Sequence, residues 1–360
     1  MAKKKIRVLV VGCGHMGASH AKAYHRRSDA FEIVGLVSRT APSRQKLNGL
    51  LGTAYGEFGD YFAALAATKP DAVCISTYPD SHAAYAIAAL EAGADVFVEK
   101  PLAETIADCE RIKATAERLG RNVVVGYILN VHPSWQRFVE IAQGLGRPLV
   151  MRMNLNQQSS GANWETHKRI LGSLSPLVDC GVHYVDVMCR MTGARPVRVS
   201  AIGARLADDI APGQVNYGQL QVTFDDGSVG WYEVGWGPMM SETAFFIKDV
   251  VGPKGCVSMV PRYAGAAGGS ADVEQHTKGE SLRVHRAQLT ADGKFAQPDE
   301  VLNISDEPDH DGLCLLEQEM FLRAIRGEQD MTGHLQAAID SLRIVLAADR
   351  SWREGQAIPL

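Results

Sequence analysis

The chain lacks an excess of charge of either sign, and it lacks long apolar runs. Its 37 Lys and Arg nearly balance 41 Asp and Glu among 360 residues, giving a net charge of −4. The only basic cluster, residues 3–5, is better explained as a solvated terminus than as a polyanion site, so we expect no nucleic-acid partner. No apolar run approaches the roughly 20 residues of a transmembrane helix, so we expect no membrane partner.

Cysteine is present, but not in a pattern typical of metal or disulfide sites. The seven cysteines include no C-x-x-C pair, and no histidine and cysteine spacing is typical of zinc, so we expect no bound metal. Several cysteines lie in apolar runs, which favours buried reduced thiols and a reducing compartment. The basic start is followed by only Ile6 and residues 8–11 as apolar residues before Gly12, fewer than a signal peptide requires. We therefore expect a cytoplasmic protein.

What the sequence does contain is a glycine pattern in a suitable setting. Residues 6–11 form an apolar, β-branched run typical of a buried parallel strand, and residues 15–27 carry helical spacing. Between them lies G-x-G-x-x-G, whose glycines permit a tight turn, close approach of a pyrophosphate and close packing of the helix on the strand. The alternative is an ordinary glycine-rich turn. The flanking strand and helix favour the binding of a dinucleotide by Gly12, Gly14, His15, Met16 and Gly17.

The order of the expected elements divides the chain into two domains. Residues 1–126 alternate short apolar strands with helices, which predicts an α/β, doubly wound parallel sheet covered on both faces. Residues 127–360 place several strands in succession, which predicts an α+β domain with a large, mainly antiparallel open sheet. In this second part we expect strands at 149–155, 197–202, 217–224, 229–234, 244–250 and 256–260, and helices at 133–143, 175–191, 317–326 and 334–352.

The end of the second strand indicates which dinucleotide is bound. Proteins that prefer NAD usually place a carboxylate about 20 residues after the glycines, where it binds the ribose hydroxyls. This chain has Ser38, Arg39 and Thr40 there instead. An arginine can pair with a 2′-phosphate, and the two hydroxyls can donate to the same group, so NADP is favoured over NAD. The alternative is that Arg39 is merely solvated beside an NAD site.

Three further residues are candidates for catalysis. Lys100 ends an expected parallel strand within an E-K-P sequence, where a lysine can stabilise the alkoxide charge that develops as hydride leaves a substrate. Asp179 and His183 lie four residues apart in an expected helix, and therefore on one face. An imidazole, with an ordinary pKa of about 6.5, is suited to accept the hydroxyl proton, and Asp179 would orient it. The plainer alternatives are a surface lysine at a strand end and a helix-surface pair.

These motifs stand together in an order that resembles the glucose-fructose oxidoreductase and inositol dehydrogenase family (Gfo/Idh/MocA). The motifs are G-x-G-x-x-G-x-x-H ending at His20, T-Y-P-D-S-H at 77–82, E-K-P at 99–101 and D-C-G-V-H at 179–183. The resemblance covers nearly the whole chain. It implies a Rossmann domain followed by an antiparallel second domain, a cis bond before Pro101, and Lys100, Asp179 and His183 as the catalytic set.

The resemblance also implies the remaining site residues. Besides the glycine loop and residues 38–40, the cofactor site would include Thr77, Pro79, His82, Glu99 and Lys100, whereas His20 would be a structural helix histidine. The substrate site would include Lys100, Tyr127, Asn130, Trp164, Asp179 and His183. Trp164 offers a flat apolar face of the kind that packs on sugar rings, although packing in the core is nearly as well supported.

The resulting expectation is an NAD(P)-dependent oxidoreductase that transfers hydride at a secondary hydroxyl or ketone of a sugar, polyol or related cyclic substrate. One alternative is a hydrolase or lyase of the same fold, in which a retained cofactor oxidises a sugar transiently. Another is a non-catalytic cofactor-binding protein, against which intact Lys100, Asp179 and His183 argue. The resemblance further implies a homodimer or homotetramer, joined by an apolar exposed face of the second sheet in strands such as 217–224 and 244–250.

Overall fold

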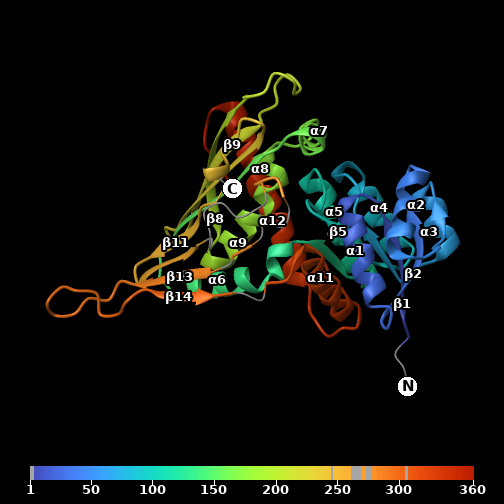
Figure 1. The fold of residues 1–360 in the computed structure, drawn as a ribbon, viewed down its shortest axis with the longest axis horizontal. Helices are drawn as coiled ribbons and strands as arrows, with labels where there is room; N and C mark the ends of the chain where they lie inside the picture. The colour runs from blue at the N-terminus through green and yellow to red at the C-terminus, as the bar shows by residue number, and fades with distance from the viewer. Residues whose placement is uncertain (1–3, 245, 261–268, 273–277, 280, 305–306) are drawn as a thin grey trace. The chain divides into compact units, whose positions relative to one another are not determined.

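The chain folds into two compact units, which Figure 1 shows in a computed structural model. The structure describes residues 4–244, 246–260, 269–272, 278–279, 281–304 and 307–360. The first unit comprises Met1–Ile128 and Pro308–Ile339, and the second comprises Leu129–Glu307 and Asp340–Leu360. The first crossing lies close to the boundary expected at residue 126. Residues 308–339 return to the first unit, whereas the expected second domain comprised all of residues 127–360. The sequence did not indicate this return, because a contact between segments far apart in the chain produces no local pattern.

The sheet of the first unit is parallel throughout and has the order β3-β2-β1-β4-β5-β6. This is the order of a doubly wound dinucleotide-binding sheet, so the expected fold class is confirmed. The central strands are apolar on both faces because helices cover both sides. The strands are β1 (Ile6–Val11), β2 (Phe31–Val37), β3 (Glu57–Phe58), β4 (Ala72–Ile75), β5 (Asp95–Glu99) and β6 (Val123–Gly126).

Local capping sets several of the helix ends in this unit. The Thr105 hydroxyl accepts a hydrogen bond from the Asp108 amide at 3.1 Å at the start of α5, and Gly120 ends that helix in the left-handed conformation. Helix α11 begins at His310, seven residues before the expected start at residue 317, because the Asp309 carboxylate accepts a hydrogen bond from the Gly312 amide at 2.7 Å. The helices are α1 (His15–Arg26), α2 (Ala41–Leu51), α3 (Tyr61–Thr68), α4 (Pro79–Glu91), α5 (Ile106–Leu119) and α11 (His310–Ile325).

The second unit is built on a nine-stranded sheet with the order β14-β13-β12-β11-β7-β10-β9-β8-β15. Strands β7 and β10 run parallel and the other neighbours are antiparallel, so the expected mainly antiparallel sheet is confirmed. The strands are β7 (Val150–Gln158), β8 (Pro196–Ala204), β9 (Tyr217–Phe224), β10 (Val229–Gly237), β11 (Lys248–Gly252), β12 (Gly255–Met259), β13 (Ser281–Arg286), β14 (Glu300–Asn303) and β15 (Ile358–Pro359).

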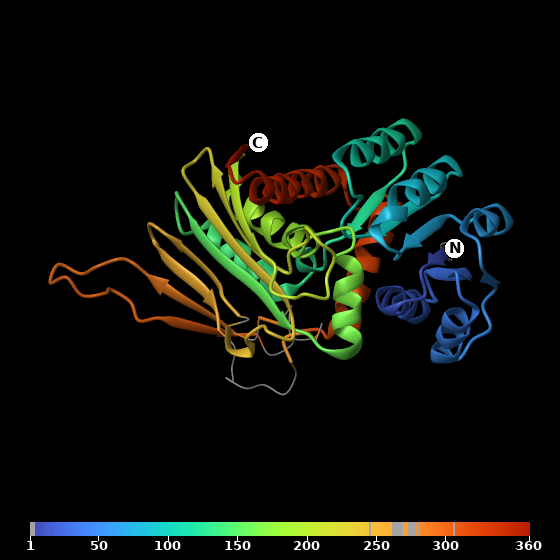
Figure 2. The ribbon, with the colours of Figure 1, turned by 90° about the horizontal axis from the view of Figure 1, so that it is seen from above.

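Helices pack on one face of this sheet (Figure 2). Alternation along β7 shows which face is covered, because Met151 and Met153 are buried whereas Arg152 between them is exposed. The opposite face of β9 carries Tyr217, Gln219, Gln221 and Thr223, so the apolar patch expected on that strand is absent. The helices of this unit are α6 (Pro133–Gln143), α7 (Gly161–Ile170), α8 (Pro176–Asp179), α9 (Gly181–Thr192) and the larger part of α12 (Thr332–Glu354).

Short 3₁₀ turns precede α6 and β11, at η1 (Ile128–Asn130) and η2 (Glu242–Ala244). In the part of the chain that the structure describes, no helix combines the length and apolar character needed to cross a bilayer.

Candidate functional site

The glycine turn between β1 and α1 has the geometry that the sequence predicts for two of its three glycines. Gly12 has φ +98°, donates its amide to the Val37 carbonyl at 2.8 Å, and would place a Cβ 2.2 Å from the Ser76 carbonyl oxygen. A Cβ on Gly17 would lie 1.9 Å from the Gly12 carbonyl oxygen. Any side chain at either position would therefore push α1 or the loop after β4 away from the turn.

The second glycine, Gly14, has open space around it. A Cβ built there meets no heavy atom within 4 Å, although Gly14 is the N-cap of α1. No side chain caps this helix start, and no acidic residue lies in the first turn, which begins with His15 and Met16. The helix therefore presents uncapped amides and the positive end of its dipole to an unfilled space. These features fit the pyrophosphate of a dinucleotide.

The end of β2 presents the three residues expected to select the cofactor. Arg39 is exposed, and its guanidinium makes no hydrogen bond or ion pair with any described residue. The Thr40 and Ser43 hydroxyls lie 2.7 Å apart, and Arg44 donates to the Ser38 carbonyl at 2.5 Å. Ser38 and Thr40 are thus tied locally, and Arg39 remains available to an anionic ligand.

Arg44 is a second arginine that the sequence analysis missed. Its Nε donates to the Glu57 carboxylate at 3.3 Å, and Asn48 donates to the other oxygen of that carboxylate at 3.1 Å. The Glu57 carboxylate, on the strand beside β2, is therefore already paired. The sequence shows only a basic residue on the helix after the second strand, and its position near the end of β2 became clear only from the fold.

The loops after β4 and β5 are joined by His82. Its Nδ1 lies 2.8 Å from the Pro101 carbonyl and its Nε2 lies 3.1 Å from the Thr77 carbonyl, and the ring is fully buried. Burial lowers the pKa of His82, so the ring is neutral and donates to one of the two oxygens. Both ring nitrogens face backbone carbonyls, so His82 joins the two loops, and its expected contact with the cofactor stays a prediction. Thr77 and Pro79 stand at the start of α4, with the Thr77 hydroxyl 2.6 Å from that of Ser81.

Glu99 and Lys100 mark the carboxyl end of β5. The buried Glu99 carboxylate lies 2.8 Å from His20 Nε2 and accepts the Lys100 amide at 3.1 Å. Glu99 therefore joins the Lys100 backbone to α1, and its expected contact with the cofactor stays a prediction. His20, expected to be a structural histidine, is buried between Glu99 and Gln318. The Lys100–Pro101 bond is cis, as the resemblance implies.

Asp179 and His183 belong to the second unit and do not share one helix as expected. The expected helix 175–191 is interrupted at Cys180, so that Asp179 ends α8 and His183 lies in the first turn of α9. A Cβ on Gly181 would lie 3.1 Å from Val345 Cγ1 and 3.4 Å from Tyr232 Cε1. Close packing against neighbouring side chains thus explains this glycine. Asp179 is buried and His183 is half-buried.

The residues expected to line a substrate pocket are mostly committed to other contacts. Tyr127 is buried in the first unit with its ring 6.2 Å from that of His334. Asn130 accepts a hydrogen bond from Arg190 on α9. Trp164 is only 7% exposed and donates its indole N–H to Asp209 at 3.1 Å. The packed interpretation of Trp164 is therefore favoured over an exposed sugar platform.

Two aromatic residues on β10 are further candidates that the sequence analysis missed. Tyr232 stacks on Tyr184 with ring centroids 4.6 Å apart, and Trp236 stacks on His167 at 4.5 Å. The Tyr232 hydroxyl and the Trp236 indole N–H are buried with no partner among the described residues. Both side chains lie on the helix-covered face of the sheet. Burial raises the pKa of Tyr232, with smaller contributions from Cys180, Tyr184 and then Asp179. Buried polar groups that lack a partner commonly await a ligand or water.

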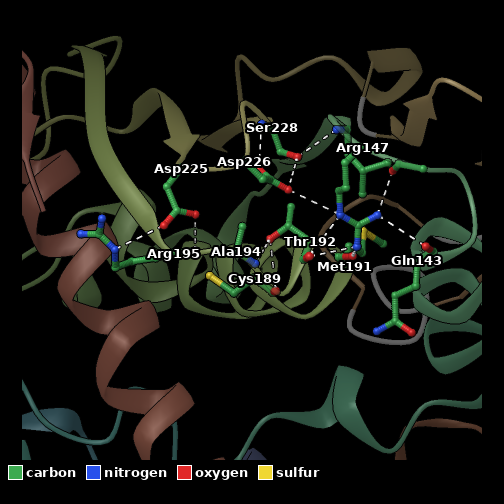
Figure 3. A network of polar contacts seen from close by, with 12 residues as sticks. Gln143, Arg147, Cys189, Met191, Thr192, Ala194, Arg195, Asp225, Asp226 and Ser228 are labelled. Carbon is green, nitrogen blue, oxygen red and sulfur yellow. Dashed lines mark hydrogen bonds and ion pairs between the residues drawn. The ribbon is translucent and has the colours of Figure 1, made fainter.

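The far end of α9 is anchored by Arg147 (Figure 3). Its Nη2 donates to the carbonyls of Met191 at 2.6 Å and Thr192 at 2.9 Å, and its Nε lies 3.4 Å from the Asp226 carboxylate. A guanidinium at the C-terminus of a helix satisfies the last carbonyls and opposes the negative end of the dipole. Arg147 therefore fixes the helix whose first turn carries His183.

The first unit thus defines a Rossmann-type dinucleotide-binding protein, and the second adds a helix-covered mixed sheet. The chain belongs to the Gfo/Idh/MocA oxidoreductase family: the family's NAD-binding Rossmann-fold domain matches residues 6–127, and its C-terminal α/β domain matches residues 140–360.

Individual relatives share only modest sequence identity with this chain. An inositol 2-dehydrogenase from Klebsiella pneumoniae is 27% identical over 182 residues, which are 50% of this chain and 52% of that protein. Inositol 2-dehydrogenase 3 from Saccharopolyspora erythraea is 32% identical over 40% of this chain and 43% of its own length. The aligned part thus spans about half the length of these curated relatives. The crystal structure of the WlbA dehydrogenase from Bordetella pertussis, in complex with NADH and UDP-GlcNAcA, shares the fold with a TM-score of 0.77, 22% identity and 99% coverage of both chains.

Proposed function

We propose that this protein is an NAD(P)-dependent oxidoreductase that acts on a secondary hydroxyl or ketone of a sugar, polyol or related cyclic substrate. The observation that carries the proposal is the uncapped start of α1 beside Gly14, an anion site with open space in front of it. The names of the relatives support the substrate class, since inositol is a cyclic polyol and UDP-GlcNAcA is a sugar nucleotide.

In this proposal the residues of the two units have separate roles in one reaction. Gly14 and the first amides of α1 hold the pyrophosphate, and bound NAD(P) supplies the hydride acceptor or donor. Lys100 hydrogen-bonds the reacting oxygen and stabilises its negative charge. His183 accepts the hydroxyl proton during oxidation and returns it during reduction, while Asp179 orients the imidazole. The unpartnered hydroxyl of Tyr232 and indole N–H of Trp236 are further candidates for contact with substrate hydroxyls.

Substitution of the catalytic set tests these roles. We expect Lys100→Ala and His183→Ala each to lower kcat about 10²- to 10⁴-fold, the usual contribution of acid-base catalysis, with cofactor affinity near that of the wild type. Asp179→Asn should be milder because it keeps the shape of the side chain. His285→Ala is the matched control, since the His285 imidazole lies on β13 and pairs with Asp299. Near-normal turnover by Lys100→Ala or His183→Ala would refute the assigned role of that residue.

The assay must begin with a panel of sugars and polyols offered with NAD and NADP. Appearance or loss of nicotinamide absorbance in proportion to substrate supports an oxidoreductase. Release of sugar without a net change in that absorbance would instead indicate a hydrolase or lyase with a retained cofactor. Cofactor binding with neither change across the panel would support a non-catalytic protein.

We propose that NADP is preferred over NAD. The exposed Arg39 has no protein partner among the described residues, and the nearby Glu57 carboxylate is occupied by Arg44 and Asn48. Arg39→Ala should weaken NADPH binding by about 1.5 to 3 kcal/mol, the range of a charged hydrogen bond, and should barely affect NADH. Lys46→Ala removes an exposed positive charge from the nearby helix α2 and controls for a general electrostatic effect on cofactor binding. Equal losses for both cofactors in a binding titration would overturn the preference.

We also propose that the protein is a homodimer or homotetramer, joined through the face of the second sheet that the helices leave open. Ile202 on β8 is 60% exposed, and Leu289 and Phe295 are exposed on the hairpin between β13 and β14. Exposed apolar side chains of this kind favour association. Light scattering should give a multiple of the chain mass, and Ile202→Asp should lower it. A monomer at micromolar concentration would refute the proposal.

All seven cysteines lie in the described residues and none of them forms a disulfide there, which supports a reducing compartment. We therefore propose that the protein is cytoplasmic. Fractionation of the source cells should recover it with cytoplasmic markers, and recovery with another fraction would refute this location.

A further inference from the structure

A buried cluster of metal-ligating side chains lies where α11 packs on α1 in the first unit. His20 comes from α1, and Cys314 and Glu317 come from α11. One potential ligand atom from each lies within 4.8 Å of the other two, and all three residues are buried. His310 is one helical turn before Cys314, with Nε2 3.6 Å from the Cys314 sulfur. Residues 310, 314 and 317 follow the spacing that places side chains on one face of a helix. The proposed hydride transfer uses none of these side chains.

Glu317 is the first sign that the cluster lacks a component. Its side chain is 1% exposed, and neither carboxylate oxygen has a hydrogen-bond partner among the described residues. A buried carboxyl group without a donor or a counter-charge is costly, and such groups in proteins are usually paired or bound to a metal. A cation beside Cys314 would satisfy both oxygens.

His20 is already oriented as a metal ligand would be. Its Nε2 lies 2.8 Å from the Glu99 carboxylate, which cannot donate when ionised, so the ring proton is on Nε2. The lone pair is therefore on Nδ1, where the Gln318 side-chain amide donates at 2.9 Å. Histidines that bind metals commonly donate their other ring N–H to a carboxylate in this way. A metal ion on Nδ1 would take the place of the Gln318 amide hydrogen.

The donor types restrict the kind of ion. A thiolate, an imidazole and a carboxylate together suit Zn²⁺ and related transition metals, whereas Mg²⁺ and Ca²⁺ prefer oxygen ligands alone. A divalent cation also balances the charges of the Cys314 thiolate and the Glu317 carboxylate inside the core. We propose that His20, Cys314 and Glu317 bind a divalent transition metal, with Zn²⁺ as the best match, and that the ion fastens α11 to α1. This differs from the expectation of no metal, because His20 is about 300 residues from Cys314 and Glu317 in sequence and meets them only in the folded unit.

The test is metal analysis of protein produced in zinc-supplemented medium and purified without chelators. We expect about one zinc ion per chain in the wild type, and most of it to be lost in Cys314→Ser and in Glu317→Gln. Cys109→Ser is the matched control, since Cys109 is an equally buried thiol on α5, and it should retain the metal. Cobalt substitution should give a thiolate-to-metal charge-transfer band in the wild type that Cys314→Ser lacks.

Wild-type protein with only traces of zinc, and with a melting temperature that added zinc does not raise, would overturn the proposal. If either variant fails to fold, the wild type still decides the question. Stripped protein should take up one equivalent of zinc in competition with a chromophoric chelator, and failure to do so would also overturn it. These readouts need no enzymatic turnover, so they stand or fall independently of the proposed oxidoreductase activity.

Discussion

Replacement of Gly14 or Gly17 by alanine should separate the binding of the cofactor from the stability of the fold. A Cβ on Gly17 would lie 1.9 Å from the Gly12 carbonyl oxygen, a backbone atom that cannot move without opening the turn. Such overpacking costs about 3 kcal/mol of folding free energy. A Cβ on Gly14 meets no heavy atom within 4 Å, and the backbone there is extended, with φ −80° and ψ −163°. Alanine can adopt that conformation without strain.

The magnitude for Gly14→Ala follows from two opposing effects on stability. Alanine is a poorer N-cap than glycine by about 0.5 to 1 kcal/mol. It also reduces the conformational entropy of the unfolded chain, which stabilises by about 0.4 to 1 kcal/mol. The net change in unfolding free energy should therefore be near zero. The methyl group would nevertheless fill the space in front of the α1 amides, at a cost of about 1.5 to 3 kcal/mol for each charged hydrogen bond lost.

Two measurements on each variant check this reasoning. Urea unfolding should show Gly14→Ala close to the wild type and Gly17→Ala clearly less stable. Fluorescence titration should show that Gly14→Ala binds both NADH and NADPH about 10- to 150-fold more weakly, since each 1.4 kcal/mol is tenfold in affinity. A stable Gly14→Ala protein with unchanged cofactor affinity would refute the placement of the pyrophosphate at this helix. A Gly17→Ala protein as stable as the wild type would refute the close contact in the turn.

The second unit offers two further predictions. Burial raises the pKa of Asp186, which is 2% exposed, to about 6 from an ordinary value of 3.8, so the wild type loses stability as pH rises between these values. In urea unfolding, Asp186→Asn should therefore be more stable than the wild type by up to about 3 kcal/mol at pH 8, and no more stable near pH 4. An equal difference in unfolding free energy at both pH values would contradict this. Arg147→Ala removes the hydrogen bonds to the last carbonyls of α9 and should lower the unfolding free energy by about 2 to 4 kcal/mol. The control Arg195→Ala removes an exposed ion pair with Asp225 and should lower it by at most about 1 kcal/mol. Similar melting temperatures for the two variants would contradict the anchoring role of Arg147.

Local signals in the sequence were sufficient for the elements that depend on neighbouring residues. The apolar run before Gly12 and the glycine spacing predicted strand, turn and helix, because Gly12 and Gly17 each lie against backbone atoms of the turn or of the loop after β4. Ser175 and Pro176 predicted a helix start, and the Ser175 hydroxyl indeed accepts from the Val178 amide at 3.4 Å. The alternation of strands and helices predicted the parallel sheet for the same reason, since side-chain periodicity reflects which faces are buried.

The interruption at Cys180 could not be predicted in this way. The spacing of Asp179 and His183 is compatible with one continuous helix, and what occupies the space around Gly181 is Val345 from α12 and Tyr232 from β10. These neighbours belong to segments more than 50 residues away. The supporting role of His82 was likewise hidden, because its partner at Pro101 lies on another loop.

The sequence by itself determined the family, the glycine turn and the residues of the expected catalytic set, because short motifs carry both the backbone geometry and the chemistry they need. Only the tertiary structure decided which unit holds residues 308–339, which carboxylate Arg44 neutralises, and that Glu317 and Cys314 meet His20. Those contacts join segments whose approach depends on the packing of whole helices and strands. Contacts between residues close in sequence give rise to a periodic pattern of apolar residues that can be recognised in the sequence. Contacts across the core depend on the summed burial of many side chains, and no single residue in the sequence indicates them.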